Sequence, residues 1–409
     1  MKGGAVEKRR YSPSNPKWFN FILRWTFGEW LLRAYDVEAR GLELFDGLRP
    51  PYVIVGNHVT TRDVFLISKL VPVPVWWVAT DAHFRGSALR FLLGLVGAIP
   101  KSKAIPDIVT IDTIVKVVRK KRGVIGLFPE GQQNWDGRTL PLIPSTAKLL
   151  KLLKIPVIVA KSRGAWASLP RWTWKRRRGG LSIEFSRLFG REELVAMETG
   201  AVEAALTEAL HHDEIAWLDG SGKTYRSTRR AEHLELALFM CPSCSALGSM
   251  RSEGTTLRCL SCGASQRLDG RYRFRRIGAV EPRFADPREW MEWQATAVGL
   301  LAFEAVADKK SEPLFSDEGV RLFRGRRMNP LNPVARGRLD LYFDRMELVV
   351  EGETHLVFHL VRVDGTGVLT RQTFEFYVGK HLYRVTYSKR NVSALKWQLA
   401  VEALKRELP

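Results

Sequence analysis

A histidine and an aspartate follow the first strongly apolar run of the folded chain at a spacing that could support general-base catalysis. Residues 52–56 (YVIVG) end at Asn57-His58, and Asp63 comes five residues after the histidine. A neutral imidazole can take a proton from an attacking hydroxyl, and a neighbouring carboxylate fixes its tautomer and stabilises the imidazolium. An alternative stays open, because Thr60 and Asp63 also match a capping box in which Asp63 only begins a helix.

Two further segments could bind an anionic group. The sequence LFPEG at 127–131 follows another apolar run. A turn containing Glu130 and Gly131 would leave backbone N–H groups free, and glycine lets an anion approach closely. The segment GAIPKSK at 97–103 places Lys101 and Lys103 on a loop, where ammonium groups could contact a phosphate. Taken singly, these features are also typical of an ordinary turn and of solvated lysines.

Short apolar runs alternate with helical patterns between residues 52 and 210. The expected strands cover 52–56, 75–79, 123–128, 156–160 and 181–185, and the expected helices cover 61–70, 87–96, 107–121, 145–153 and 192–210. This alternation predicts an α/β fold with a mostly parallel sheet flanked by helices. Ligands bind beyond the carboxyl ends of the strands in such sheets. His58 and Glu130 each follow a strand, so both are expected at that edge.

All four cysteines fall within a short segment and form two C-x2-C pairs. Cys241 and Cys244 make the first pair, and Cys259 and Cys262 make the second after fourteen intervening residues. Two pairs at this separation can close a tetrahedral four-thiolate site, which predicts a zinc ribbon. Because all four ligands would come from the protein, we expect the Zn²⁺ to be structural and not catalytic.

The order and spacing of these motifs resemble the PlsC family, the 1-acyl-glycerol-3-phosphate acyltransferases of phospholipid synthesis. The resemblance covers about residues 50–190. It rests on NHxxxxD at 57–63, the Gly…Lys loop at 97–103, FPEG at 128–131 and the apolar strand IPVIVA at 155–160. The segment GAWASLPRWTWKRRRGG at 164–180 also resembles a segment of some bacterial members. The resemblance implies a glycerolipid acyltransferase-like fold.

The resemblance also implies roles for individual residues. His58 matches the family's general base and Asp63 its orienting carboxylate. Glu130 and Gly131 match the motif implicated in binding the acceptor's phosphoglycerol group. Lys103 stands where many members have an arginine that contacts the acceptor phosphate.

Several positions depart from the family pattern around this phosphate. Lys103 keeps the charge of the usual arginine but lacks its bidentate fork. Gln132-Gln133 replaces the usual threonine-arginine, and Pro144 replaces a lysine often found before the next helix. Arg138, or the arginines at 176–178, could supply the missing positive charge.

The family's reaction is direct acyl transfer without a covalent acyl-enzyme. The resemblance therefore implies that an acceptor hydroxyl, deprotonated by His58, attacks the thioester carbon of acyl-CoA or acyl-ACP. We predict a membrane-associated O-acyltransferase that converts 1-acyl-glycerol-3-phosphate into phosphatidic acid. Two alternatives stay open: the same reaction on another lysophospholipid or a glycolipid, and a catalytically inactive basic zinc-ribbon binding protein. The intact His58, Asp63 and FPEG favour the enzyme.

Charge and apolar patterning point to a membrane surface. The 409 residues include 64 Lys+Arg and 43 Asp+Glu, a net charge of +21, and 45% are hydrophobic, which excludes a disordered chain. This surplus predicts acidic partners, and we expect membrane lipids, a lysophospholipid acceptor and CoA phosphates or acyl carrier protein rather than nucleic acid. Residues 18–35 (WFNFILRWTFGEWLLRAY) are typical of an interfacial amphipathic helix, although packing on the core is the alternative.

No apolar run of about 18 residues and no signal-peptide pattern occurs. We therefore expect a peripheral protein on the cytoplasmic side of the plasma (inner) membrane. Four parts are predicted: an interfacial segment at 1–35, an acyltransferase domain at 36–225, a zinc ribbon at 234–270 and a C-terminal α+β domain at 271–409. In the last part we expect a helix over 286–306, loops over 307–335, antiparallel strands from 337 and a helix over 393–408, with a PH-like topology.

Overall fold

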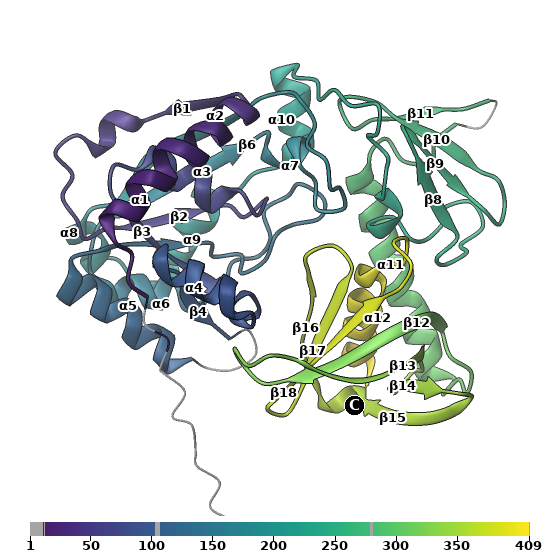
Figure 1. The fold of residues 1–409 in the computed structure, drawn as a ribbon. Coiled ribbons are helices and arrows are strands. Elements are labelled where there is room, and N and C mark those ends of the chain that lie inside the picture. The colour runs from purple at the N-terminus through teal and green to yellow at the C-terminus, as the bar shows by residue number, and fades with distance from the viewer. Residues whose placement is uncertain (1–10, 12, 103–106, 279–280, 409) are drawn as a thin grey trace, which may run out of the picture.

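The first sheet of the protein carries the predicted motifs. The computed structural model describes residues 11, 13–102, 107–278 and 281–408. This sheet has the strand order β1-β7-β6-β2-β5-β3-β4 (Figure 1). Its strands are β1 (Val37–Arg40), β2 (Val53–Gly56), β3 (Val75–Thr80), β4 (Ile99–Lys101), β5 (Val124–Leu127), β6 (Val157–Arg163) and β7 (Leu181–Phe189). Only the β6–β7 pairing is antiparallel, so the prediction of a mostly parallel sheet is confirmed.

Helices cover both faces of this sheet, as predicted. Alternate residues of β2 serve the two faces: Val53 and Val55 pack with one apolar cluster, and Ile54 packs with the other. The flanking helices are α3 (Asp63–Leu70), α4 (Ser87–Leu95), α5 (Ile108–Lys121), α6 (Ser145–Leu153), α7 (Ala165–Ser168), α8 (Arg191–Ala196), α9 (Thr199–Leu210) and α10 (Glu214–Ser221). Central strands buried on both sides explain the continuous apolar runs of the sequence.

The expectation of one helix over 192–210 is wrong, because two helices lie there. The chain becomes extended at Met197 and Glu198, between α8 and α9. The ammonium group of Lys151 in α6 donates to the carbonyl oxygens of Leu194 at 3.1 Å and Val195 at 3.0 Å, and also to that of Met197. A lysine on these last carbonyls satisfies the end of α8, so the break is fixed by a contact from elsewhere in the chain.

The N-terminal helical segment packs on α3 and leaves an apolar outer face. It consists of α1 (Lys17–Leu23), a π-helical turn η1 (Arg24–Gly28) and α2 (Glu29–Tyr35). Glu29 pairs with Lys69 of α3 at 2.9 Å, and the Phe27 and Phe65 rings meet edge to face at 5.2 Å. The outer side chains are at least half exposed: Trp18, Phe21, Ile22, Trp25 and Trp30. Among the described residues, no helix has the length and apolar character needed to cross a membrane.

A small antiparallel sheet follows and carries the cysteines. Its order is β11-β10-β9-β8, with β8 (Met250–Glu253), β9 (Thr256–Cys259), β10 (Ser265–Leu268) and β11 (Phe274–Arg276). The sheet thus extends past the expected boundary at residue 270. Phe274 of β11 contacts Trp290 of α11 (Pro287–Ala307) at a ring separation of 5.4 Å. Gln294 of α11 accepts from the N–H groups of Phe239 and Met240, which precede the sheet, and donates to the carbonyl of Ala237.

The C-terminal part is a seven-stranded antiparallel sheet with a helix on it. The order is β15-β14-β13-β12-β18-β17-β16, and α12 (Ala394–Glu407) packs against β16 and β17 (Figure 1). The strands are β12 (Phe315–Gly325), β13 (Asn332–Leu341), β14 (Arg345–Val350), β15 (Glu353–His359), β16 (Val363–Leu369), β17 (Thr373–Val378) and β18 (His381–Tyr387). The expected α+β architecture is present, and the PH-type likeness stays a topological prediction.

The expectation of loops over 307–335 is wrong, because β12 and the start of β13 lie there. A register shift between Asp317 and Val320 interrupts the alternation of β12, and only Val320 and Leu322 are fully buried within it. β12 is hydrogen-bonded on both sides, to β13 and β18. Pairing with β13 and β18 therefore holds β12 as a strand, although its sequence is too polar and irregular to predict a strand.

Candidate active site

The turn from β2 to α3 brings His58 and Asp63 into contact. His58 Nδ1 lies 3.1 Å from Asp63 Oδ2, and the histidine side chain is 21% exposed whereas that of the aspartate is 1% exposed. The carboxylate therefore holds the Nδ1 edge of the imidazole and favours the tautomer with the proton on Nδ1. Nε2 is left as the basic nitrogen of this pair, as a general base requires.

Asp63 orients His58 and also braces the turn before α3, whereas no side-chain hydrogen bond caps that helix. It is the first residue of α3, and its carboxylate accepts from the N–H groups of Val59 and Thr60 at 2.8 Å each and from Thr60 Oγ1 at 2.8 Å. The same Oδ2 atom contacts His58. The carboxylate therefore ties the turn before α3 to the imidazole, and the hydrogen bonds from that turn fix where it points.

Glu130 ties this turn to the loop after β5. Because β2 and β5 are parallel neighbours, their carboxyl ends meet at one edge. One carboxylate oxygen of Glu130 accepts from the backbone N–H of His58 at 2.6 Å, and the other accepts from that of Leu140 at 2.7 Å. Burial raises the pKa of Glu130 to about 8, against the opposing effect of these two hydrogen bonds. Both oxygens are thus engaged within the protein, where they position the histidine backbone.

Aromatic rings hold the imidazole from the side. The rings of His58 and Phe128 stack at a centroid separation of 4.2 Å and an angle of 15°, and Trp77 of β3 stacks on Phe128 at 4.8 Å and 11°. Asn57 anchors the base of the turn through two hydrogen bonds to the backbone of Ser162, at 2.9 and 2.8 Å. The imidazole plane is therefore fixed by packing as well as by Asp63.

The predicted phosphate-binding residues that the structure describes lie on different elements. Lys101 ends β4, opposite Thr80 of β3, and burial lowers its pKa. Lys103 lies outside the described residues. Arg138 pairs with Asp136 at 2.7 Å and with Glu292 of α11 at 3.3 Å, so its charge is already compensated.

Gly131 differs from its expected role. Its backbone N–H donates to the carbonyl of Phe128 at 3.0 Å, so this donor is used within the turn. Its φ is +68°, and a Cβ atom there would lie 2.6 Å from the side chain of Ile143. Glycine is required here by the turn and by the close side chain.

The arginines at 176–178 divide into two kinds. Arg177 is buried, hydrogen-bonds to the Tyr272 hydroxyl and the Arg230 carbonyl, and is structural. Arg176 lies over the Tyr35 ring at 5.2 Å, and Arg178 is exposed. Arg176 and Arg178 are therefore the members of this run that are free for an anion.

The C-terminal sheet contacts loops beside this site. Arg171 is buried, stacks on Trp135 at 4.6 Å, and donates to the carbonyl oxygens of Gln133 at 2.6 Å, Thr370 at 3.1 Å and Val368. Burial lowers its pKa to about 9. Because Gln133 lies two residues after the end of FPEG, Arg171 joins the motif loop to the turn between β16 and β17. The sequence had no signal for this contact.

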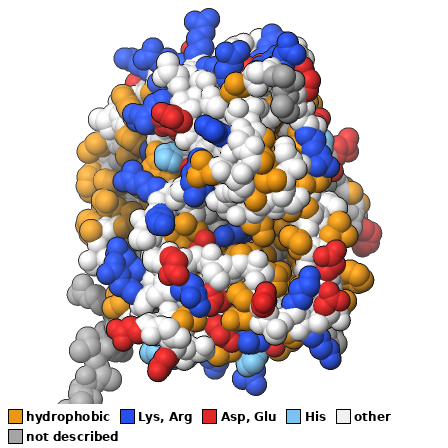
Figure 2. Space-filling model, turned by 90° about the vertical axis from the view of Figure 1, so that its right-hand side faces the viewer, with side chains coloured by type: hydrophobic (Ala, Val, Ile, Leu, Met, Phe, Trp, Pro, Cys, Tyr) orange, Lys and Arg blue, Asp and Glu red, His pale blue; other side chains and the backbone are white. Residues whose placement is uncertain are grey.

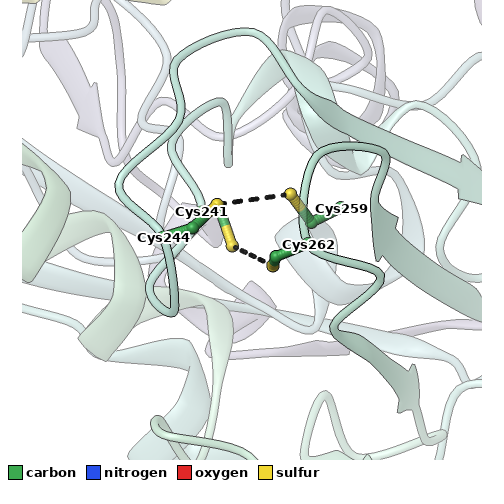
Figure 3. Close-up of side chains that lie close together, drawn as sticks. All are labelled: Cys241, Cys244, Cys259 and Cys262. Atoms are coloured by element: carbon green, nitrogen blue, oxygen red, sulfur yellow. Dashed lines mark hydrogen bonds between the residues drawn. The ribbon is translucent and has the colours of Figure 1, made fainter.

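The four cysteine thiols converge from two similar loops (Figure 3). Their sulfur atoms all lie within 4.8 Å of one another, with Cys241–Cys262 and Cys244–Cys259 separations of 3.7 Å. A tetrahedral ion with Zn–S bonds of 2.3 Å needs sulfur–sulfur separations of about 3.8 Å. In each loop the N–H of the first cysteine donates to a carbonyl five residues on, in Ala246 and Ala264.

Ring stacking and the Glu130 bridge are the features that sequence reasoning missed. Phe128 was visible as the first letter of FPEG, and Trp77 as an aromatic residue in a predicted strand. Their stacking on His58 depends on the β3-β5-β2 strand order, which the sequence does not state.

Comparison with known proteins agrees with this geometry. A family model described as Acyltransferase matches residues 36–160. The 1-acyl-sn-glycerol-3-phosphate acyltransferase of Saccharomyces cerevisiae is 25% identical over 132 residues, which cover 31% of this chain and 43% of that protein. The Caenorhabditis elegans protein acl-1, whose name assigns it the same activity, is 28% identical over 132 residues, 30% of this chain and 47% of that protein. This chain spans less than half the length of these curated relatives.

Among solved structures, the LPA acyltransferase PlsC of Thermotoga maritima aligns with a TM-score of 0.41 and 16% identity, over 47% of this chain and 77% of that one. The segment 36–160, with its parallel sheet and its His58–Asp63 pair, is an acyltransferase domain. This segment is similar to the 1-acyl-sn-glycerol-3-phosphate acyltransferases.

Proposed function

We propose that the protein is a peripheral membrane O-acyltransferase that makes phosphatidic acid from 1-acyl-glycerol-3-phosphate, with His58 as general base. The observation that carries this proposal is the His58–Asp63 contact of 3.1 Å at the carboxyl edge of the parallel sheet. The names of the two curated relatives support the acceptor. Acyl-CoA or acyl-ACP is the proposed donor.

The proposed reaction follows from the orientation of the imidazole. Nε2 of His58 takes the proton of the acceptor hydroxyl as its oxygen attacks the thioester carbon. The C–O bond forms, the C–S bond breaks, and the imidazolium returns its proton to the departing thiolate. Asp63 stabilises the imidazolium between these steps because its carboxylate touches Nδ1. Glu130, Phe128 and Trp77 position the ring and its backbone.

Peripheral membrane contact is proposed for an apolar face formed by four helices. Besides the outer side chains of α1 and α2, Phe91 of α4 is 67% exposed and Ile108 of α5 is 78% exposed. Figure 2 shows hydrophobic side chains gathered along one edge of the molecule, with Lys and Arg side chains beside them. Tryptophan with neighbouring cations suits the headgroup depth of a bilayer. Such a face would bring the lipid acceptor to the enzyme.

A structural Zn²⁺ is proposed for the four cysteines. The sulfur separations of 3.7 Å fit a tetrahedral ion, and all four ligands come from the protein. Cys241, Cys244, Cys259 and Cys262 would hold the ion as thiolates and would join the two loops of the small sheet. Because thiols stay reduced in the cytosol, this site favours the cytoplasmic face of the membrane.

We propose the four parts that the sequence predicts, with the end of the zinc ribbon moved from residue 270 to Arg276. The role of the C-terminal α+β domain would include support of the FPEG loop, because Arg171 joins the two.

Purified protein incubated with labelled acyl-CoA or acyl-ACP and a panel of lysolipids tests the activity. We expect phosphatidic acid from 1-acyl-glycerol-3-phosphate, loss of product in His58→Ala, and full activity in His355→Ala, which removes an exposed histidine of β15. Product formed from a different lysophospholipid or a glycolipid would show that this lipid, and not 1-acyl-glycerol-3-phosphate, is the acceptor. Failure with every acceptor and both donors would support the inactive binding protein and overturn the proposal.

A further inference from the structure

An open, strongly basic cavity lies beside the end of α2, and neither His58 nor Asp63 lines it. Its volume is about 580 Å³, and it is bounded by the last turn of α2, the segment at 176–180 and residues 224 and 226. The charged side chains that line it are Arg33, Asp36, Arg176, Arg178 and Arg226. Four arginines thus face one aspartate.

Three of these arginines are not neutralised within the described part of the protein. Arg33 pairs with Glu29 of its own helix at 3.1 Å, but no ion pair of the described residues includes Arg176, Arg178 or Arg226. Arg178 and Arg226 face each other in an antiparallel bridge, with backbone hydrogen bonds of 3.2 and 2.8 Å. Like charges held opposite each other repel, and an anion between them would remove that repulsion.

The backbone at this place is suited to a close approach. Gly180 has a φ of +75°, and a Cβ atom on Gly179 would lie 2.4 Å from the Tyr225 ring. Among the hydrogen bonds of the described residues, none uses the N–H of Gly179 or Gly180. Two backbone donors next to guanidinium groups form the kind of concavity that holds phosphate oxygens.

The position of the cavity indicates where its ligand comes from. Arg33 and Ala34 of the cavity lie three and four residues after Trp30, so they share its helix face. Trp30 is 59% exposed and belongs to the proposed membrane face. A guanidinium at this depth would meet the phosphates of the same lipid layer that the tryptophans contact.

We propose that this cavity binds the phosphate group of an anionic phospholipid of the membrane. Arginine is the side chain best matched to phosphate oxygens, because its planar donors can bind two of them together. The lipid would remain unreacted in this site and would hold the enzyme against anionic membranes. The inference rests on the proposed membrane contact of α1 and α2, but not on the proposed acyl transfer.

Binding of the full-length protein to sedimenting vesicles tests the proposal without any acyl donor. The vesicles are pure phosphatidylcholine, or phosphatidylcholine containing phosphatidylglycerol. The variant is R178Q/R226Q, which removes two exposed charges and leaves the bridge backbone in place. The matched control is R321Q/R336Q, which removes two exposed arginines that face each other on β12 and β13 and line neither described cavity.

We expect R178Q/R226Q to bind anionic vesicles about tenfold or more weakly than the unmodified protein, since each arginine near an anionic surface contributes about fivefold. Its binding to neutral vesicles should be unchanged, and the control should match the unmodified protein on both. Trp25→Ala/Trp30→Ala should weaken binding to both vesicle types, which reports the apolar contact separately. Equal anionic binding by R178Q/R226Q and the control would overturn the proposal.

A third arm separates lipid phosphate from free phosphate. Inorganic phosphate, added at a concentration that leaves the ionic strength matched by chloride, should displace the protein from anionic vesicles no more than chloride does. Displacement by inorganic phosphate, lost in R178Q/R226Q, would show a site for free phosphate and would overturn the lipid assignment. His58→Ala should bind vesicles normally, so loss of acyl transfer and loss of lipid binding are distinguishable.

Discussion

Replacing Asp63 by asparagine separates the charge of the proposed catalytic pair from its geometry. Oδ2 of Asp63 accepts from the N–H groups of Val59 and Thr60, so the amide oxygen of an asparagine would take that place. Oδ1 accepts from Thr60 Oγ1 at 2.8 Å, and a hydroxyl can accept from an amide N–H₂ instead. The surrounding donors therefore orient the asparagine with its oxygen toward His58 and keep the histidine tautomer.

The expected loss is then the electrostatic effect of one negative charge. Two unit charges about 4 Å apart interact by about 4 kcal/mol at an effective dielectric constant of 20. The imidazolium is only partly formed in the transition state, and the His58 side chain is 21% exposed, so less than this full interaction is lost. Removing the Asp63 charge is therefore expected to raise the activation barrier by about 2–3 kcal/mol. That range corresponds to a fall in kcat of about 30- to 150-fold.

The assay is the initial rate of CoA release with the lysolipid acceptor at saturation, alongside thermal unfolding. Asp63→Asn should keep the thermal transition within a few degrees of the unmodified protein, and Asp63→Ala should lower both stability and rate, because it leaves three donors without an acceptor. A loss of less than about threefold in Asp63→Asn would refute the catalytic role of the charge. A loss near 10⁴-fold would refute the orientation argument, since that size is typical of a wrong tautomer.

Three further predictions concern the residues that support the site. Glu130 has a raised pKa of about 8 when folded and an ordinary value near 4.5 when unfolded, so its protonated form stabilises the fold below pH 4.5 and this contribution is lost as the pH rises to 8. Denaturant titrations from pH 5 to 8 should therefore show stability falling by up to about 1.4 kcal/mol per pH unit more in the unmodified protein than in Glu130→Gln; parallel curves would contradict this. Arg171→Lys keeps the charge but cannot span three carbonyl groups, so the free energy of unfolding should fall by about 2–4 kcal/mol, and unchanged stability would show that the contact to the C-terminal sheet contributes little. Cys262→Ser should lose the bound zinc, measured by atomic absorption, and should melt at a lower temperature. Ser261→Ala in the same loop should keep the zinc content and the melting temperature of the unmodified protein. An unmodified protein that contains no zinc after purification would contradict the proposed site.

Local patterns were enough to predict much of the acyltransferase fold. The strands β2 and β5 are buried throughout, and β3, β6 and β7 each begin with at least three buried residues, so each contains an apolar run. The helices α5 and α6 begin and end within a residue of the prediction, and α11 and α12 do so as well. Where a prediction failed, a distant contact replaced a local signal: Lys151 ends α8, and β13 and β18 hold the polar strand β12.

The sequence by itself determined the groups that lie near each other along the chain. Asp63 is five residues from His58, so one strand-to-helix turn is enough to bring them together, and the C-x2-C pairs likewise need only a tight loop. Spacing over a few residues is fixed by backbone geometry alone, which is why these residues could be named in advance.

Only the tertiary structure decided what lies across the sheet and between its parts. Glu130 binds the His58 backbone over 72 residues of chain, and Arg138 is neutralised by Glu292, 154 residues away. The basic cavity unites Arg33, Arg178 and Arg226 from three separate segments. Strand order and packing set these distances, and no short-range pattern in the sequence encodes them, because each depends on how many other residues pack between the partners.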